Sequence, residues 1–223
     1  MCNLYSETKG QQAIKEIAGA MLDRTGNLPP LPGIFPDYAA PIVRNHPDGR
    51  ELTMARWGMP SPPEKLVGKR VDGGWTNIRT PSARYWRPWM TIEHRCVVPF
   101  TSFAEPEPFP LADGKRPPVW FALDETRPLA FFAGVWTRWT SVRKLKEGEV
   151  TADLFAILTT GANNDVKPIH EKAMPVILTT REEIDLWMTA PPAQALTLQR
   201  PLPDGILEIV ARGAKEDMGG SVA

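Results

Sequence analysis

The stretch PIVRNHPDGRELTMARWG (residues 41–58) predicts two β-strands joined by a tight turn. Its arms, PIVR and ELTMARWG, are rich in apolar and β-branched residues, while NHPDG between them gathers residues that turns favour. Similar β-rich runs recur downstream: RCVVPF (95–100), PVWFAL (118–123), LAFFAGVW (129–136), LFAILTT (154–160), MPVILTT (174–180) and ILEIV (206–210). Because these runs do not alternate regularly with helices, a parallel α/β sheet is not expected. We expect an α+β fold with a curved, mostly antiparallel sheet, a barrel-like core, flanking helices and long Pro-rich loops.

Two longer helices are predicted to flank this sheet. TKGQQAIKEIAGAMLDR (8–24) carries apolar residues at helical spacing, and Thr8 with Gln11 has the spacing of a capping box. A second helix is predicted to begin at Thr180, with Glu183 completing its cap.

The segment NLPPLPGIFPDYAAP (27–41) carries five prolines, so we expect a packed loop without regular structure. No internal repeat divides the chain of 223 residues. We expect a single domain over residues 1–212, followed by a disordered, polar and Gly-rich tail at 213–223.

The charge of the chain is balanced as a whole but uneven along its length. Lys and Arg total 26, as do Asp and Glu, yet residues 56–95 hold eight basic and three acidic residues, a net charge of +5. The same stretch contains Trp57, Trp75, Tyr85, Trp86 and Trp89. Basic residues interleaved with aromatic rings are typical of a groove for single-stranded nucleic acid, with Arg56, Arg79 and Arg84 as candidate phosphate contacts. The alternative is that the tryptophans are core residues and the arginines a solvated face.

Several classes of protein are not expected. No apolar run approaches the roughly 20 residues that cross a membrane, and no secretory signal precedes the domain. With two well-separated cysteines, we expect a cytoplasmic protein without disulfides, in which Cys96 is a buried core thiol. His170 and Glu171 begin an H-E-x-x-H pattern, but Met174 stands where the second histidine is needed, so neither a metal nor a cofactor is expected.

Cys2 directly follows the initiator methionine. Removal of Met1 would leave a free α-amine and a thiol on one residue. Because such an amine has a pKa of about 7.7–8.0, against about 10.4 for lysine, part of it is nucleophilic at neutral pH. An aminothiol condenses with an aldehyde to an imine, which the thiol then closes to a five-membered thiazolidine. An internal cysteine cannot do this, because its nitrogen is an amide. The alternative is that Cys2 stands at this position by accident.

Five motifs in order, MCNLY, ARWGMP, TNIRT, RCVVPFTSFAE and PIHEKAMPVIL, resemble those of the SRAP family, the SOS-response-associated peptidase-like proteins that shield abasic sites in single-stranded DNA. The resemblance implies that Cys2 is the crosslinking nucleophile, that Asn77 orients the reacting centre and that Glu105 is the acid/base carboxylate. It further implies that His170 is the active-site histidine. Two DNA contacts are also implied: Arg79 to phosphate, and Thr159 (or Thr160) through its hydroxyl.

The sequence departs from the family pattern at three points. Asn3 and Leu4 follow Cys2 in place of Gly-Arg, Pro106 follows Glu105 in place of tryptophan, and one extra residue separates His170 from the Met-Pro pair. None of these departures removes a reacting group.

The resemblance implies a monomer that crosslinks to abasic sites in single-stranded DNA and is associated with the nucleoid when bound. Two alternatives stay open. A cysteine peptidase would use Cys2 as thiolate, His170 as base and Asn77 or Glu105 as orienting group, and loss of Met1 could be its own reaction or that of an aminopeptidase. A non-catalytic reader of DNA would not use Cys2 at all.

Overall fold

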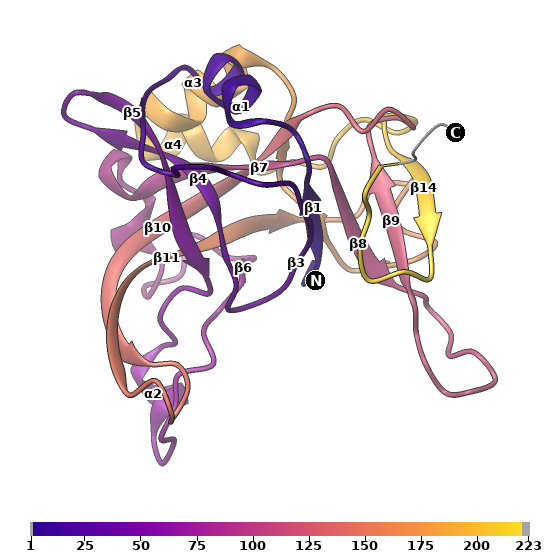
Figure 1. The fold of residues 1–223 in the computed structure, drawn as a ribbon, viewed down its shortest axis with the longest axis horizontal. Coiled ribbons are helices and arrows are strands. Elements are labelled where there is room, and N and C mark those ends of the chain that lie inside the picture. The colour runs from indigo at the N-terminus through magenta and orange to yellow at the C-terminus, as the bar shows by residue number, and fades with distance from the viewer. Residues whose placement is uncertain (1, 220–223) are drawn as a thin grey trace.

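The structure is a computed structural model that describes residues 2–219, and the predicted hairpin lies at its centre (Figure 1). Strands β4 (Ala39–His46) and β5 (Gly49–Trp57) pair antiparallel across the turn between His46 and Gly49. β4 also pairs with β7 (Arg95–Phe100), β7 with β10 (Ala130–Val142), and β10 with β11 (Glu149–Thr160), all antiparallel. β11 then pairs parallel with β5, which closes the five strands into a barrel. The predicted α+β class with a curved, mostly antiparallel core is confirmed.

Short strands extend this barrel. β2 (Ala20–Asp23) pairs parallel with β5, and β6 (Asn77–Ile78) pairs parallel with β11. β12 (Met174–Pro175) and β13 (Ile177–Leu178) pair antiparallel with β11 and β10, respectively.

A second, smaller sheet holds the beginning of the chain. Its strand order is β14-β9-β8-β1-β3, formed by β14 (Glu208–Arg212), β9 (Pro118–Ala122), β8 (Ser102–Pro106), β1 (Tyr5–Glu7) and β3 (Leu31–Ile34). β3 lies inside the proline-rich segment, so the expectation that residues 27–41 lack regular structure is wrong. A proline is tolerated there because β3 is an edge strand, where the missing N–H breaks no ladder.

The first helix is shorter than the sequence predicts. α1 spans Gln11–Ala18 and ends at Gly19, whose φ of 64° lies in the left-handed region. The residues that follow form β2 instead of continuing the helix. The predicted capping box is also wrong: Gly10 is the N-cap, and the Gln11 amide bonds Asp23 and the backbone N–H of Leu28.

The second helix begins where it is predicted to begin. α3 spans Arg181–Thr189, and the Thr180 hydroxyl accepts a hydrogen bond from the Glu183 backbone N–H. Two single-turn helices complete the set, α2 (Pro63–Leu66) and α4 (Pro192–Ala195). Short 3-10 turns lie at Arg87–Met90, Ile92–His94 and Leu196–Leu198.

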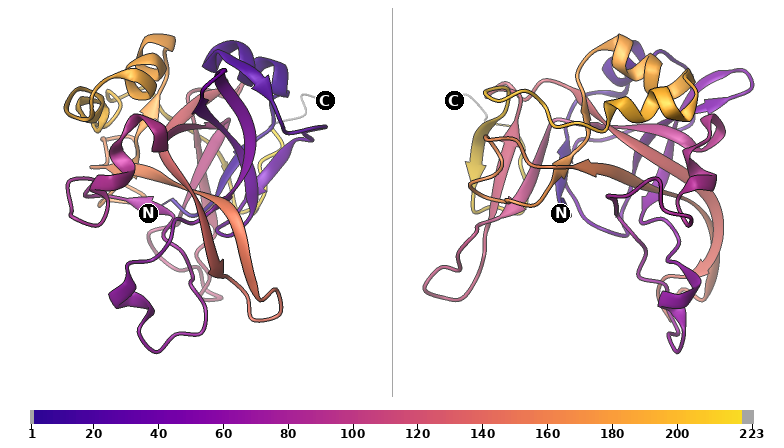
Figure 2. Two further views of the ribbon diagram at one scale, coloured as in Figure 1. Left: turned by 90° about the vertical axis from the view of Figure 1, so that its left-hand side faces the viewer. Right: turned by 180° about the vertical axis from the view of Figure 1, so that it is seen from behind.

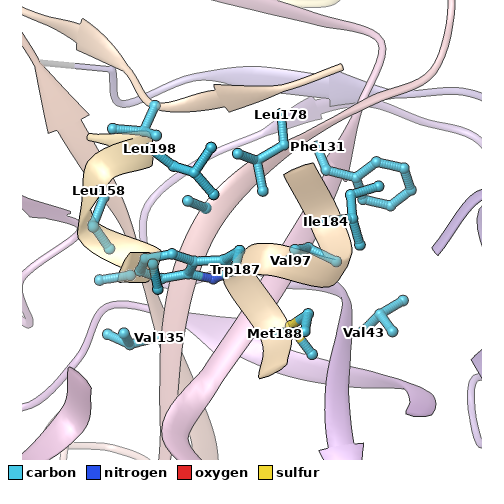
Figure 3. Packing of buried hydrophobic residues seen from close by; sticks show 14 of the residues in the cluster. Val43, Val97, Phe131, Val135, Leu158, Leu178, Ile184, Trp187, Met188 and Leu198 are labelled. Atoms are coloured by element: carbon cyan, nitrogen blue, oxygen red, sulfur yellow. The ribbon is translucent and has the colours of Figure 1, made fainter. Parts of the chain in front are cut away.

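Helix α3 is fastened to the barrel by Trp187, which packs among Val97, Val135 and Leu158 (Figure 3). Its indole N–H donates to the carbonyls of Cys96 and Gly134, at 2.9 and 3.2 Å. Burying such a ring with its N–H satisfied fixes the helix on the barrel wall. Cys96 is fully buried, in agreement with its prediction as a core thiol.

Arg95 is also part of this junction. It is fully buried, and its guanidinium donates at 2.7 Å to the carbonyls of Trp187 and Ala190 at the end of α3. A cation at a helix C-terminus is stabilising. Arg95, one of the eight basic residues of the 56–95 stretch, is therefore a structural residue.

Three segments project to one side of the molecule: the β10–β11 hairpin, the α2 region and the loop at 107–117 (Figure 1). The first two lie on one side of β1 and the third on the other (Figures 1 and 2). Strand β1 therefore lies between these projecting segments (Figures 1 and 2).

The chain after β14 folds back over the small sheet. Asp217 donates its backbone N–H to Pro32 and accepts hydrogen bonds from Ser102 and Arg127 through its buried carboxylate. Residues 213–219, within the tail predicted to be disordered, thus have defined contacts in the structure. Residues 220–223 of that predicted tail lie outside the described residues.

Candidate active site and nucleic-acid interface

Cys2 is held in place by the strand that begins after it. β1 pairs with β8 through Tyr5 and Phe103, and the Ala104 N–H donates to the Leu4 carbonyl at 2.9 Å. β1 pairs with β3 on its other side. Backbone pairing on both sides explains why this chain end is ordered, although free termini usually fray. Cys2 itself is fully buried, and its thiol donates to the Leu4 carbonyl at 3.4 Å.

Asn77 fixes the backbone of Cys2 from the barrel. Its side-chain N–H donates to the Cys2 carbonyl at 2.8 Å and to the Thr76 hydroxyl at 2.8 Å. The Thr76 hydroxyl in turn donates to Asn3 Oδ1 at 3.0 Å. The Asn77 Oδ1 atom is buried without a hydrogen-bond partner among residues 2–219. An amide held in this way presents an acceptor beside the terminal residue, which suits an orienting role.

Glu105 lies next to Cys2 on the neighbouring strand. Continuing the Tyr5–Phe103 register toward the start of the chain places Asn3 opposite Glu105. Glu105 is 1% exposed, and this burial raises the pKa of its carboxyl. A carboxyl with a raised pKa exchanges protons closer to neutral pH, as a general acid/base needs.

His170 reaches the same place from the loop before β12. Its Nδ1 lies 2.8 Å from the carbonyl oxygen of Ala173 and 3.3 Å from the backbone nitrogen of the same residue, so Ala173 fixes the orientation of the ring. Glu105 and His170 line one pocket of about 400 Å³, here called the Glu105 pocket. Its lining includes Asn3, Phe35, Glu105, Arg116, His170 and Lys215.

The Cys2 thiol has an environment that favours its protonated form. Burial raises the pKa of the Cys2 thiol far above its ordinary value, and the adjacent Glu105 carboxylate raises this pKa further. The geometry therefore presents a neutral thiol beside a carboxyl group.

A second pocket, of about 530 Å³, lies on the other side of Asn77 and is called the Trp75 pocket. Its lining includes Glu64, Trp75, Asn77, Arg79, Tyr85 and Trp86. Arg79 is exposed, and Trp75, which is 37% exposed, packs against Trp86 with ring centroids 5.8 Å apart. A cation beside exposed aromatic faces is the combination that binds single-stranded nucleic acid. The Asn3–Thr76 hydrogen bond lies between the Trp75 pocket and the Glu105 pocket.

Not every predicted contact lies at these pockets. Arg56 is held by Asp37 at 2.6 Å and by Glu147 at 3.0 Å. Thr159 is fully buried, and its hydroxyl donates to the Ile78 carbonyl, while Thr160 is 7% exposed. Arg84 is exposed but does not line the Trp75 pocket. Of the predicted residues, the structure thus brings Cys2, Asn77, Glu105, His170 and Arg79 together.

The aromatic residues of the 56–95 stretch divide between the two roles that the sequence left open. Trp57 is fully buried and stacks on Phe155, so it is a core residue. Trp75 faces the pocket. Their sequence neighbourhoods are equally basic, so only the fold separates them.

Two residues of the site carried no assigned role in the sequence: Asn3 and Thr76, which connect the terminal segment to Asn77. Thr76 directly precedes Asn77 in the TNIRT motif, so the motif itself could have indicated it. Asn3 was visible as a polar residue beside Cys2 where the family pattern has glycine.

Among residues 2–219, no three His, Cys, Asp or Glu side chains lie close enough together to hold a metal ion. Within the same residues no helix is long and apolar enough to cross a bilayer.

Comparison with known proteins places the chain. The family model described as SOS response associated peptidase (SRAP) matches residues 1–212. A solved structure of a protein from Bordetella bronchiseptica is similar with a TM-score of 0.67 and 25% identity, covering 96% of this chain and 99% of that one. A protein from Bacteroides thetaiotaomicron has a TM-score of 0.65 and 19% identity, covering 93% of this chain and 90% of the other. A phage-related protein from Bordetella bronchiseptica has a TM-score of 0.64 and 21% identity, covering 93% and 92%, respectively. No curated protein matches the sequence.

The family model covers nearly the whole chain, so the chain belongs to the SRAP family.

Proposed function

We propose that this SRAP-family protein binds single-stranded DNA and forms a covalent thiazolidine with an abasic site through Cys2, after Met1 has been removed. The adduct would shield the site in the DNA damage response. The observation that carries the proposal is the fixed Cys2: Asn77 holds its carbonyl at 2.8 Å, beside a pocket that Glu105 and His170 share.

The reaction would begin with the sugar. An abasic deoxyribose is a cyclic hemiacetal, and Glu105 would take the proton of its C1 hydroxyl and return a proton to the ring oxygen, which opens the ring to an aldehyde. The raised pKa of the Glu105 carboxyl suits this two-way transfer. His170, whose ring is held at Ala173 through Nδ1, would shuttle protons and steady the sugar hydroxyls.

The covalent steps would then follow at Cys2. The neutral α-amine adds to the aldehyde carbon, and loss of water gives the imine. The thiol sulfur next adds to the same carbon while its proton passes to the nitrogen, so that the net change is thiazolidine formation with release of one water. Asn77 would fix the attack geometry, since its amide already bonds the Cys2 carbonyl. Ring closure would trap the imine before β-elimination could cut the strand.

The family description also names a peptidase, and Cys2 with His170 would supply its nucleophile and base. A cysteine peptidase needs a thiolate, which is favoured by an environment that lowers the thiol pKa. Here burial and Glu105 raise the pKa of the Cys2 thiol. A neutral thiol can still close an imine ring, so this environment favours the crosslinking reaction over general peptide cleavage.

The identity of the nucleophile is the decisive test. Mature protein, a form carrying a few uncleaved residues before Cys2, Cys2→Ser and Cys2→Ala should be incubated with single-stranded DNA that contains one abasic site. We expect intact mass spectrometry to show loss of Met1 and a stable adduct only with the free terminal cysteine. Cys2→Ser should give a scarcer or more labile adduct, and Cys2→Ala at most an imine that leaves the strand open to elimination.

Cys96→Ser is the matched control, because Cys96 is equally buried but internal, and its adduct yield should equal that of the parent. A stable adduct on the extended protein would exclude the aminothiol mechanism, since its nitrogen is then an amide. Tight DNA binding without any adduct in the mature protein would instead support the non-catalytic reader.

A further inference from the structure

We propose that Arg116 and Lys215 bind a backbone phosphate of the DNA strand, on the opposite side of Cys2 from Arg79. The inference rests on the proposed function, because it extends the DNA path through the same site. It also gives a role to the segment after β14, which carries Lys215.

The two cations line the same pocket although they are distant in sequence. Arg116 lies in the loop before β9, Lys215 lies after β14, and both line the Glu105 pocket with Glu105 and His170. Both residues are exposed, and neither side chain forms an ion pair within residues 2–219. Two unpaired cations at the rim of one pocket are a site for an anion.

The position of the pocket favours a phosphodiester as that anion. An abasic nucleotide carries one phosphate on each side of its sugar. The Trp75 pocket offers Arg79 to one of them, and the Glu105 pocket lies beyond the Asn3–Thr76 hydrogen bond. A strand whose sugar lies at Cys2 and Glu105 would therefore bring its other flanking phosphate toward Arg116 and Lys215.

A chain of hydrogen bonds places Lys215. Before it, the Gly213 N–H donates to the Pro118 carbonyl at 2.9 Å, and the Trp120 indole donates to the Ala214 carbonyl at 2.8 Å. After it, Asp217 donates its N–H to the Pro32 carbonyl at 2.8 Å. Residues 213–217, here called the strap, thus run from β9 to β3, and backbone hydrogen bonds hold the strap at both of its ends.

The strap has its own anchor and its own steric requirement. The Asp217 carboxylate bonds Ser102 at 2.6 Å and Arg127 at 2.9 Å, and these side chains are buried. At Gly33 on β3, a Cβ atom would lie 2.8 Å from the Lys215 carbonyl oxygen, so only glycine lets the strap approach. The strap lies beyond residue 212, where the family match ends.

A chemical cycle tests the phosphate contact. Binding of a single-stranded oligonucleotide with a tetrahydrofuran abasic analogue should be measured by fluorescence anisotropy across a salt series, with the parent, Arg116→Ala, Lys215→Ala, the double variant Arg116→Ala/Lys215→Ala and Arg24→Ala. Each lost phosphate contact on single-stranded DNA should reduce the slope of log affinity against log salt by about 0.7. We expect this reduction for the double variant Arg116→Ala/Lys215→Ala and a smaller one for each single variant, because the two cations would share one phosphate. Arg24, which is exposed and lines neither pocket, should leave the slope unchanged.

Neutral methylphosphonates then locate the contact. Replacing the phosphate on one side of the abasic analogue should weaken binding by the parent but cause little further loss in Arg116→Ala/Lys215→Ala, which lacks both cations. The same replacement on the other side should weaken both proteins equally and spare Arg79→Ala. Gly33→Ala should reproduce the slope of Lys215→Ala by displacing the strap, and adding Gly33→Ala to Lys215→Ala should change nothing more.

The inference would be overturned if Arg116→Ala and Lys215→Ala both kept the salt dependence of the parent. It would also be overturned if each methylphosphonate weakened binding as much in the variants that lack these cations as in the parent. If either outcome were seen while the parent protein still crosslinked abasic DNA, the proposed function would stand and only the phosphate contact would be excluded. Failure of the parent to form any adduct would count against the proposed function itself.

Discussion

At the scale of single residues, the site combines two buried groups, Cys2 and Glu105, whose pKa values are both raised by burial. Cys2 is buried near Glu105. Asn77 donates to the Cys2 carbonyl, and His170 lines the same pocket as Glu105. An ionised Glu105 opposes formation of a thiolate, and burial opposes ionisation of both groups. The arrangement holds the thiol neutral while leaving the carboxyl able to exchange protons, which is the division of labour that the proposed reaction needs.

Glu105→Gln should slow adduct formation by about 10²–10⁴-fold while leaving DNA affinity nearly unchanged, because it removes a positioned acid/base and no phosphate contact. The carboxylate form begins ring opening, so the rate of the parent should rise with pH through the raised pKa of Glu105. A second rise should follow near the amine pKa of about 7.7–8.0.

Single-turnover rates on abasic single-stranded DNA between pH 4 and 9 would measure this profile. The variant should lack the lower rise and keep the upper one. A variant that crosslinks at the parental rate would show that Glu105 is not the acid/base.

At the scale of elements, the small sheet orders both ends of the described chain. β1 is paired on both edges, and the strap is held to the same sheet through Asp217. Burial acts to raise the pKa of the Asp217 carboxyl, but hydrogen bonds from Arg127 and Ser102 outweigh it and lower this pKa. The ion pair is therefore formed at neutral pH.

Asp217→Asn should lower the free energy of unfolding by about 3 kcal/mol, because it leaves the buried Arg127 without its counter-charge. A lowered carboxyl pKa stabilises the fold fully above the unfolded value near 3.9, and this stabilisation is lost as the pH falls toward the lowered pKa of the folded state. The difference from the parent should therefore shrink as the pH falls below about 4.

Urea unfolding at pH 7 and at pH 3.5 would measure this difference. Asp113→Asn, an exposed aspartate in the 107–117 loop, is the control and should stay within about 0.5 kcal/mol of the parent. An equal loss for Asp217→Asn at both pH values would mean that the ion pair is not its cause.

At the scale of the whole molecule, the projecting segments lie on both sides of β1, and the proposed DNA path runs through the two pockets past Cys2. The β10–β11 hairpin and the α2 region project on one side of β1, and the 107–117 loop projects on the other (Figures 1 and 2). The Trp75 pocket offers aromatic faces that stack on unpaired bases, which a closed duplex does not present.

We therefore expect a covalent adduct with an abasic site in single-stranded DNA and far less with the same site inside an intact duplex. Denaturing gel shifts with matched oligonucleotides would measure both yields. Trp75→Ala should weaken single-strand binding by about 1–3 kcal/mol, the value of one stacked base. Equal yields on the two substrates would exclude a single-strand preference.

The sequence by itself determined what depends on neighbouring residues. The β4–β5 hairpin follows from alternating apolar arms and a turn, and the start of α3 follows from the Thr180 cap. The chemistry proposed for Cys2 depends on its place directly after Met1, and the SRAP motifs were sufficient to identify the family. These features are legible because local propensity and covalent chemistry do not require a distant partner.

The tertiary structure decided everything that requires such a partner. The proline-containing segment at β3 forms a strand because its backbone pairs with β1. Arg95 is a structural residue because the carbonyls at the end of α3 accept its hydrogen bonds. Arg56 lies in an ion-pair network because Asp37 is brought beside it. The association of Cys2 with Asn77, and of Glu105 with His170, spans most of the chain. A charge or an aromatic ring has the same local pattern whether it is buried, paired or exposed, since the free energy that decides between these states comes from contacts that the sequence order does not reveal.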